Sequence, residues 1–245
     1  MSHLIDGNIA LIFAGGTGSR MGSANLPKQF LMLGGRPIIA HTLKHFEQHD
    51  LIDEIVVVCV DGWLDHLAAI IDDNHFSKIT AIVSGGKTGQ ESIFHGLRAI
   101  KNNCTLSDKS VVLVHDGVRP LIDEETITKC IQSVRKFGCT ATVAPVVETI
   151  IEEREGKVER VVDRSRCKLA RAPQGFFFRE IYEAHIKAIR EGLDNFTDSI
   201  SLMSFYGYDI YTINGPSNNI KITTRQDYFA FKGYMDYEEM SQFWD

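Results

Sequence analysis

Five short apolar runs, each followed by a stretch with helical periodicity, constrain the fold of this chain more than any other feature. The runs are rich in β-branched residues and cover 8–14, 54–60, 79–84, 110–116 and 140–146. Continuous apolar runs of this length are typical of strands buried on both faces of a parallel sheet. Between them, apolar residues recur at helical spacing over 38–48, 63–73, 89–102 and 124–138. This alternation predicts βαβ units and therefore an α/β fold with a mostly parallel sheet.

The second part of the chain breaks the alternation. Residues 147–171 contain two strand-like pieces around a polar Glu155-Gly156 turn, which indicates a hairpin arm projecting from the sheet. After the arm we expect three helices, a strand and a strand-like segment, over 178–191, 197–204, 226–241, 209–213 and 219–224 respectively. A chain of 245 residues suits one such domain. We therefore expect a single domain spanning 1–245, with the β-arm as an insertion.

Charge and composition exclude several classes of protein. The formal net charge of −6 argues against nonspecific nucleic-acid binding, which requires a basic surface. The five cysteines are widely spaced and include no CxxC pair, which disfavours a disulfide framework or a zinc site. No run approaches the ~18 to 20 apolar residues of a membrane span, and the sequence MSHLIDGN lacks the basic region of a signal peptide. We expect a cytoplasmic protein that binds neither nucleic acid nor a membrane.

Polar clusters follow three of the predicted strands. The glycine-rich segment AGGTGSRMG follows the first strand, Gly85 and Gly86 follow the third, and His115 and Asp116 end the fourth. Ligands of open α/β sheets bind outside the carboxyl ends of the strands. We therefore expect the three clusters to converge on one crevice, with His115 in a structural role.

The glycine-rich segment fits neither of two familiar phosphate-binding loops. Met21 occupies the third glycine position of the dinucleotide fingerprint, and Ser23 follows Gly22 where a P-loop has lysine. The segment still contains what an anion site needs: glycines permit close backbone approach, and Arg20 and Lys28 supply positive charge. A structural loop with solvated cations is the alternative.

The segment AGGTGSRMG…PKQF resembles the signature of the nucleotidyltransferases that couple CTP to a small polyol phosphate. Further segments match that family in order: HDGVRP (115–120), APVVET (144–149), DR (163–164), APQGF (172–176), TD (197–198) and NIKIT (219–223). One branch of the family makes CDP-ribitol from ribitol 5-phosphate for teichoic acids, capsules or related polymers. The other acts on 2-C-methyl-D-erythritol 4-phosphate in isoprenoid synthesis. The segments NLPKQF, DGVRP and IKITT favour the ribitol branch.

This resemblance implies a Rossmann-like three-layer sandwich of the nucleotide-diphospho-sugar transferase type, with a protruding β-arm. It also implies attack by an acceptor phosphate oxygen on the α-phosphorus of CTP, with release of pyrophosphate. Such a reaction between anions needs positioning and electrostatic stabilisation more than a covalent nucleophile. The residues implied as catalytic are Arg20, Lys28 and Lys221. Those implied in nucleotide binding are Ala14, Gly15, Gly16, Thr17, Gly18, Gly86 and Ser92. Those implied in acceptor binding are Asp116, Thr149, Arg164 and Asp198.

Several of these roles have alternatives. Asp116 is expected to bind acceptor hydroxyls, the ribose of CTP or Mg²⁺, the ion that accompanies a triphosphate, but a strand-end aspartate also forms Asx turns. Asp198 fits a helix cap equally well. Arg164 lies on the expected arm, and arms in this family exchange across a homodimer, so Arg164 is expected to act in the partner's site. Without the resemblance, Arg164 is a solvated charge and Lys221 a lysine that extends its amine to solvent.

Two departures from the family pattern bear on the acceptor and the nucleotide. The stretch Lys87–Gln90 lacks the usual acidic residue and arginine, and Ala172 replaces a threonine. A noncatalytic nucleotide-binding protein, a nucleotidyltransferase for another NTP and an oxidoreductase are the rival interpretations. Retention of Arg20 and Lys28 opposes the first, and Met21 opposes the last.

Overall fold

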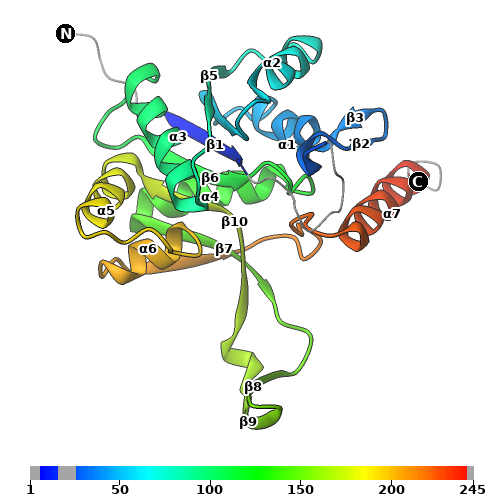
Figure 1. Cartoon of the computed structure of the whole chain (residues 1–245), viewed down its shortest axis with the longest axis vertical. Helices are drawn as coiled ribbons and strands as arrows, with labels where there is room; N and C mark the ends of the chain where they lie inside the picture. Colours follow the sequence, from blue (N-terminus) through cyan, green and yellow to red (C-terminus); the bar gives the residue numbers. More distant parts are fainter. Residues whose placement is uncertain (1–5, 16–25, 242–245) are drawn as a thin grey trace.

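The computed structural model describes residues 6–15 and 26–241, and its centre is a seven-stranded sheet in the order β11-β7-β10-β6-β1-β4-β5 (Figure 1). The strands are β1 (Asn8–Ala14), β4 (Glu54–Cys59), β5 (Ile79–Ser84), β6 (Val111–Asp116), β7 (Cys139–Pro145), β10 (Lys168–Phe177) and β11 (Ile210–Asn214). β1 pairs in parallel with β4 and β6, β4 with β5, and β11 with β7. Only β10, between β6 and β7, runs antiparallel within this described sheet. The predicted α/β fold with a mostly parallel sheet is confirmed.

Helices cover both faces of the sheet and produce three layers. One face carries α1 (Ile38–Glu47), α2 (Leu64–Asp73) and α4 (Glu124–Phe137), and the other carries α3 (Gly89–Asn103), α5 (Phe178–Arg190) and α6 (Ser199–Phe205). The alternation along β1 shows why: Ala10 and Ile12 pack with the first set of helices, and Ile9 and Leu11 with the second. All four side chains are fully buried. A strand with two buried faces has no polar side, which is why its sequence is a continuous apolar run.

Two segments differ from the predictions. Residues 168–177, for which no strand of the main sheet was predicted, form the antiparallel strand β10. Residues 219–224 were predicted to be strand-like but have no regular secondary structure. In this segment the Ile222 N–H donates to Val118 O at 2.9 Å, and the Ile222 side chain is fully buried. Burial of one side chain, and not strand pairing, therefore explains the apolar character of the segment.

The hairpin β8 (Ile150–Arg154) and β9 (Lys157–Val162) forms a sheet of its own, which extends away from the body of the protein in Figure 1. At its tip Glu155 and Gly156 both have positive φ, 52° and 79°, as the turn of a tight hairpin requires. The 3₁₀ turn η3 (Arg164–Arg166) follows. Lys168 pairs with Pro145 of β7 in the main sheet. The segment that projects beyond this sheet therefore lies between residues 145 and 168.

The remaining elements lie beside α1. They are the 3₁₀ turn η2 (Lys28–Phe30), the short strands β2 (Met32–Leu33) and β3 (Arg36–Pro37), and the helix α7 (Arg225–Ser241). A small buried cluster that includes Leu33 of β2, Ile38 of α1 and Phe231 of α7 packs these three elements together. Within 6–15 and 26–241, no helix has the length and apolar character needed to cross a membrane.

Candidate active site

The loops after β1 and β5 touch each other at the carboxyl edge of the sheet. A Cβ added to Gly15 would lie 3.0 Å from Ser92 Oγ, and one added to Gly85 would lie 3.0 Å from the same oxygen and 3.3 Å from Gly15 Cα. Such contacts are tighter than most contacts of a Cβ atom, so a side chain at either position would push Ser92 or the facing backbone away by a few tenths of an ångström. Glycine at both positions favours this close approach, and the convergence predicted for the two clusters is present.

Ser92, on α3, holds this junction. Its side chain is 1% exposed, its hydroxyl donates to Thr88 O at 2.8 Å, and it accepts a hydrogen bond from Gly86 N at 2.9 Å. Thr88 in turn caps α3 by accepting from Glu91 N at 3.0 Å. The hydroxyl of Ser92 thus fixes the path of the backbone at Gly86. Contact of Ser92 or Gly86 with a nucleotide stays a prediction.

Lys28 lies in η2, directly beside the end of β1. The neighbouring Gln29 is buried and donates from Nε2 to Ala14 O at 2.8 Å, which ties η2 to the strand. Lys28 is itself 9% exposed, an unusual degree of burial for an ammonium group. Gly16, Thr17, Gly18 and Arg20 lie outside the described residues, so the roles predicted for them stay predictions.

Asp116, at the end of β6, is the centre of a charged cluster. Its carboxylate accepts from Lys221 Nζ at 2.6 Å and from Arg119 Nε at 2.7 Å. Only 14% of the Asp116 side chain and 10% of the Arg119 side chain are exposed. Lys221 and Arg119 outweigh the effect of burial and hold the pKa of Asp116 well below its usual range, so the carboxylate is charged at neutral pH.

Asn219 positions this cluster. The residue is fully buried, its Nδ2 donates to Ala172 O at 2.9 Å, and its carbonyl accepts from Arg119 Nη1 at 3.0 Å. These bonds fasten the segment before Lys221 to both β10 and Arg119. Lys221 can therefore reach Asp116 while its amine also lies 5.6 Å from the ring centroid of Phe13.

His115, which precedes Asp116, has a structural position. The side chain is fully buried against Phe46, with ring centroids 5.0 Å apart, and its Nε2 lies 3.1 Å from Arg119 O. Burial lowers the pKa of His115 to about 4, so the ring is neutral at pH 7.

Asp198 caps α6. Its Oδ1 accepts from Ser201 N at 2.9 Å, and its Oδ2 accepts from Gln174 Nε2 at 3.1 Å. Gln174 also accepts from Ile200 N at 3.2 Å, so β10 and the start of α6 are joined by two side chains. The capping alternative for Asp198 is thus present in the structure. Asp198 also lines the pocket described next, and its contact with the acceptor stays a prediction.

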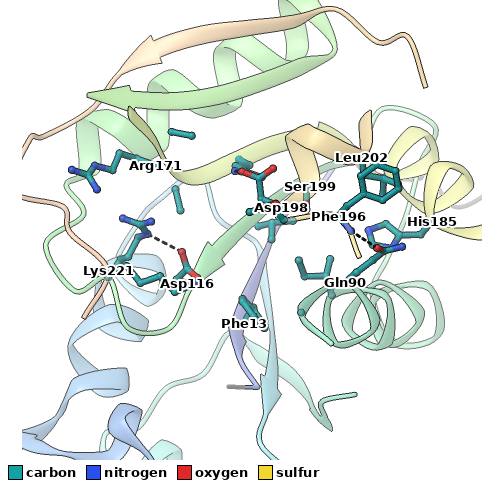
Figure 2. A pocket seen from close by; sticks show the side chains of 18 residues that line it. Phe13, Gln90, Asp116, Arg171, His185, Phe196, Asp198, Ser199, Leu202 and Lys221 are labelled. Atoms are coloured by element: carbon teal, nitrogen blue, oxygen red, sulfur yellow. Dashed lines mark hydrogen bonds and ion pairs between the residues drawn. The ribbon is translucent and has the colours of Figure 1, made fainter. Parts of the chain in front are cut away.

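Asp116, Asp198 and Lys221 all line one pocket of about 350 Å³ (Figure 2). Asp116, Arg171 and Lys221 lie toward one end in that view, and Gln90, His185 and Leu202 toward the other. Its lining includes residues that sequence reasoning missed: Phe13, Gln90, Arg119, Arg171, Gln174, His185 and Phe196. Arg119 could have been found in the HDGVRP segment. Gln174 could likewise have been found in the APQGF segment, and Gln90 ends the stretch Lys87–Gln90. Arg171, His185 and Phe196 share no local motif with them and reach the pocket only after β10, α5 and the loop before α6 have packed together.

Two of the predicted acceptor residues lie elsewhere. Thr149 and Arg164 are exposed, and Arg164 Nη1 donates to Val147 O at 2.6 Å. Both belong to the segment that leaves the body of the protein in Figure 1, and neither is among the described residues that line the pocket. Within one chain, the structure does not bring them to Asp116.

The described residues do not fit a metal ion well. Both oxygens of Asp116 face a cation, and a divalent ion there would meet the repulsion of Lys221 and Arg119. Across the described ranges, no group of three or more His, Cys, Asp and Glu side chains lies close enough to hold a metal. Asp116 is therefore a poor candidate for the metal-binding role that the sequence suggested.

Comparison with known proteins identifies the family of the chain. The family model described as "IspD: 2-C-methyl-D-erythritol 4-phosphate cytidylyltransferase" matches residues 8–236. A ribitol-5-phosphate cytidylyltransferase of Vibrio parahaemolyticus is 46% identical over 96% of this chain and 98% of its own length. A 2-C-methyl-D-erythritol 4-phosphate cytidylyltransferase of Clostridium acetobutylicum is 36% identical over 91% of this chain and 95% of its own length.

A solved structure shares the fold. The 4-diphosphocytidyl-2C-methyl-D-erythritol synthase of Anaerococcus prevotii superposes with a TM-score of 0.80, at 28% identity, over 94% of this chain and 99% of that one. The family model matches residues 8–236, and the relatives are similar across nearly the whole chain, so the chain belongs to the IspD family of cytidylyltransferases.

Proposed function

We propose that this enzyme transfers CMP from CTP to D-ribitol 5-phosphate and releases pyrophosphate. The geometric observation that carries the proposal is the ion pair of Lys221 with Asp116, placed where the pocket meets the carboxyl ends of β1 and β6. The preference for ribitol over methylerythritol follows the relatives, since a relative named for ribitol is 46% identical and one named for methylerythritol is 36% identical.

In the proposed reaction a phosphate oxygen of the acceptor attacks the α-phosphorus of CTP. The new bond is oxygen to α-phosphorus, and the bond that breaks joins the α-phosphorus to the bridging oxygen of the leaving pyrophosphate. Arg20 and Lys28 neutralise the triphosphate and the charge that develops in the transition state, while Lys221 holds the acceptor phosphate. Asp116 keeps the amine of Lys221 in place and is available to acceptor hydroxyls through the remaining lone pairs of its oxygens.

The same proposal covers the magnesium ion and the compartment. Mg²⁺ enters as the complex of CTP, held by phosphate oxygens, since the described residues provide no cage of their own. We place the enzyme in the cytoplasm. The five free cysteines are compatible with that reducing compartment.

We also propose a homodimer in which the arm of one copy completes the site of the other. Support comes from the position of Arg164 and Thr149, which lie on the arm and away from the pocket of their own chain. The arm exposes apolar side chains as well: Val158 and Val161 are 57% and 63% exposed. Apolar groups on a protruding hairpin are typical of a segment that packs against another chain.

The test is release of pyrophosphate by the purified enzyme with CTP and Mg²⁺, measured in parallel with ribitol 5-phosphate and 2-C-methyl-D-erythritol 4-phosphate. We expect turnover with ribitol 5-phosphate and at least tenfold less with the other acceptor. The reverse preference would assign the enzyme to isoprenoid synthesis. Replacement of CTP by UTP and ATP checks the choice of base.

A further inference from the structure

The end of the pocket farthest from Lys221 has a distinct chemistry. We define the inner chamber by five residues that line it: Gln90, His185, Phe196, Ser199 and Leu202. They come from α3, α5, α6 and the loop between α5 and α6. Figure 2 shows His185 beside Gln90 and Phe196, with Asp198 and Ser199 between this group and Asp116.

Three polar atoms of the inner chamber lack hydrogen-bond partners. His185 is 1% exposed and Ser199 is 2% exposed, and among the described residues nothing bonds to His185 Nδ1, His185 Nε2 or Ser199 Oγ. Gln90 differs, because its Nε2 donates to Leu193 O at 2.8 Å and its Oε1 accepts from Phe196 N at 3.1 Å. Buried polar groups are nearly always paired, so unpaired groups that line a pocket point to a ligand.

The chemistry of these atoms narrows the kind of ligand. Burial lowers the pKa of His185 to about 4, and the neutral ring offers one N–H donor and one nitrogen acceptor. The Ser199 hydroxyl also donates and accepts. Phe94 stacks on His185, with ring centroids 5.9 Å apart and planes 12° apart, which limits rotation of the imidazole. Alcohol groups, which are donors and acceptors at once, match this set, whereas a phosphate would find no cation in the inner chamber as defined.

We propose that the inner chamber binds the hydroxyl-bearing end of the acceptor, and that His185 and Ser199 select polyol chains long enough to reach them. This rests on the proposed function. Lys221, Arg119 and Arg171 line the pocket near Asp116, so its cations lie where the acceptor phosphate is needed and its neutral hydrogen-bonding groups lie at the opposite end. A polyol phosphate has the same asymmetry, with its charge at one terminus only.

The experiment compares two acceptors of different length in steady-state assays. Ribitol 5-phosphate is the full acceptor, and erythritol 4-phosphate is one hydroxyl-bearing carbon shorter. In His185→Leu we expect kcat/KM for ribitol 5-phosphate to fall about 10- to 100-fold through KM, because a substrate hydroxyl loses its buried partner. The kcat/KM for erythritol 4-phosphate should change by less than about twofold, which is as small as the effect of most surface substitutions. Ser199→Ala should act in the same direction, and His185→Gln should recover part of the loss.

Two controls separate recognition from folding. His95→Leu makes the same change at a half-buried histidine on α3 whose Nδ1 lies 3.0 Å from Ser84 O, outside the pocket, and it should leave both KM values unchanged. The thermal midpoint of His185→Leu should not fall, because the change removes two unpaired buried nitrogens. If the thermal midpoint falls instead, the two acceptors are compared in His185→Gln. An unchanged ratio of their kcat/KM values in that variant overturns the proposal.

A direct readout uses protein labelled with ¹⁵N-histidine, in which the His185 signals are assigned by their loss in His185→Leu. Ribitol 5-phosphate should shift both nitrogens of His185. Equal losses for the two acceptors, or binding of ribitol 5-phosphate without a shift of these signals, overturns the inference while the proposed function stands. Absence of turnover with every polyol phosphate, despite binding of CTP, overturns the proposed function, and the inference with it.

Discussion

Replacement of Asp116 by asparagine tests the charged cluster most directly. The change keeps the shape of the side chain but removes the charge that Arg119 and Lys221 share. Arg119 is only 10% exposed, so its guanidinium would lose its charged partner in a site that water barely reaches. Lys221 is 38% exposed and can turn toward solvent at little cost.

The magnitude follows from this difference in burial. Removing one partner of a buried pair typically costs ~3–5 kcal/mol, but the asparagine oxygen can still accept one bond and Arg119 keeps its bond to Asn219 O. We therefore expect a loss of about 2–4 kcal/mol in the free energy of unfolding at pH 7. Urea unfolding followed by circular dichroism measures it. Asp108→Asn is the control, because Asp108 is 91% exposed and 4.0 Å from Arg179, and no change in stability is expected there.

The dependence of stability on pH provides a second check on the charge of Asp116. The pKa of Asp116 is lower in the folded protein than in the unfolded chain, where it is about 3.9. Its contribution to stability is therefore complete above the unfolded pKa and is lost as the pH falls through the folded pKa. The difference between wild type and Asp116→Asn should stay constant from pH 8 to about pH 5 and shrink below about pH 4. Equal stability of the two proteins at pH 7 would refute this account of the cluster.

Two other predictions concern catalysis. Lys28→Ala should lower kcat at least about 100-fold without loss of the circular dichroism signal, because it removes a cation from the transition state, while Lys44→Ala on the exposed side of α1 should leave kcat unchanged. Normal turnover of Lys28→Ala would reject the mechanism. Lys221→Ala and Arg164→Ala should each be inactive, but when unfolded together and refolded in equal amounts they should regain about a quarter of wild-type activity, because random pairing of a symmetric dimer leaves one site in four intact. No recovery would show that Arg164 does not act in the partner's site.

The sequence predicted those parts of the protein that depend on local pattern. The run 8–14 alternates between two apolar environments in the sheet, and the structure contains β1 at these residues. Helices predicted over 38–48 and 124–138 appear as α1 and α4, within one residue at each end. Asp116 and Lys221, taken from motifs 105 positions apart, lie 2.6 Å apart. The resemblance had assigned both residues to the site, but their ion pair depends on the irregular segment around Lys221, which Asn219 fastens to β10 and Arg119.

Other features depended on tertiary packing. β10 lies between β6 and β7 and pairs with both in the antiparallel direction, a pairing that no local periodicity encodes. The burial of Asn219 and of His185 is set by neighbours far along the chain, and their residue types alone favour the surface or an intermediate position.

The sequence by itself therefore determined the alternation of strands and helices up to residue 146, the layered α/β architecture and two charged residues of the pocket, Asp116 and Lys221. The tertiary structure decided which oxygen each cation faces, that Arg164 lies away from the pocket of its own chain, and that one end of the pocket is neutral with unpaired nitrogens. The physical reason is the distance along the chain over which each effect acts. Hydrophobic periodicity acts over one helix or strand, whereas hydrogen bonding and burial at a site depend on groups that only the folded chain brings together.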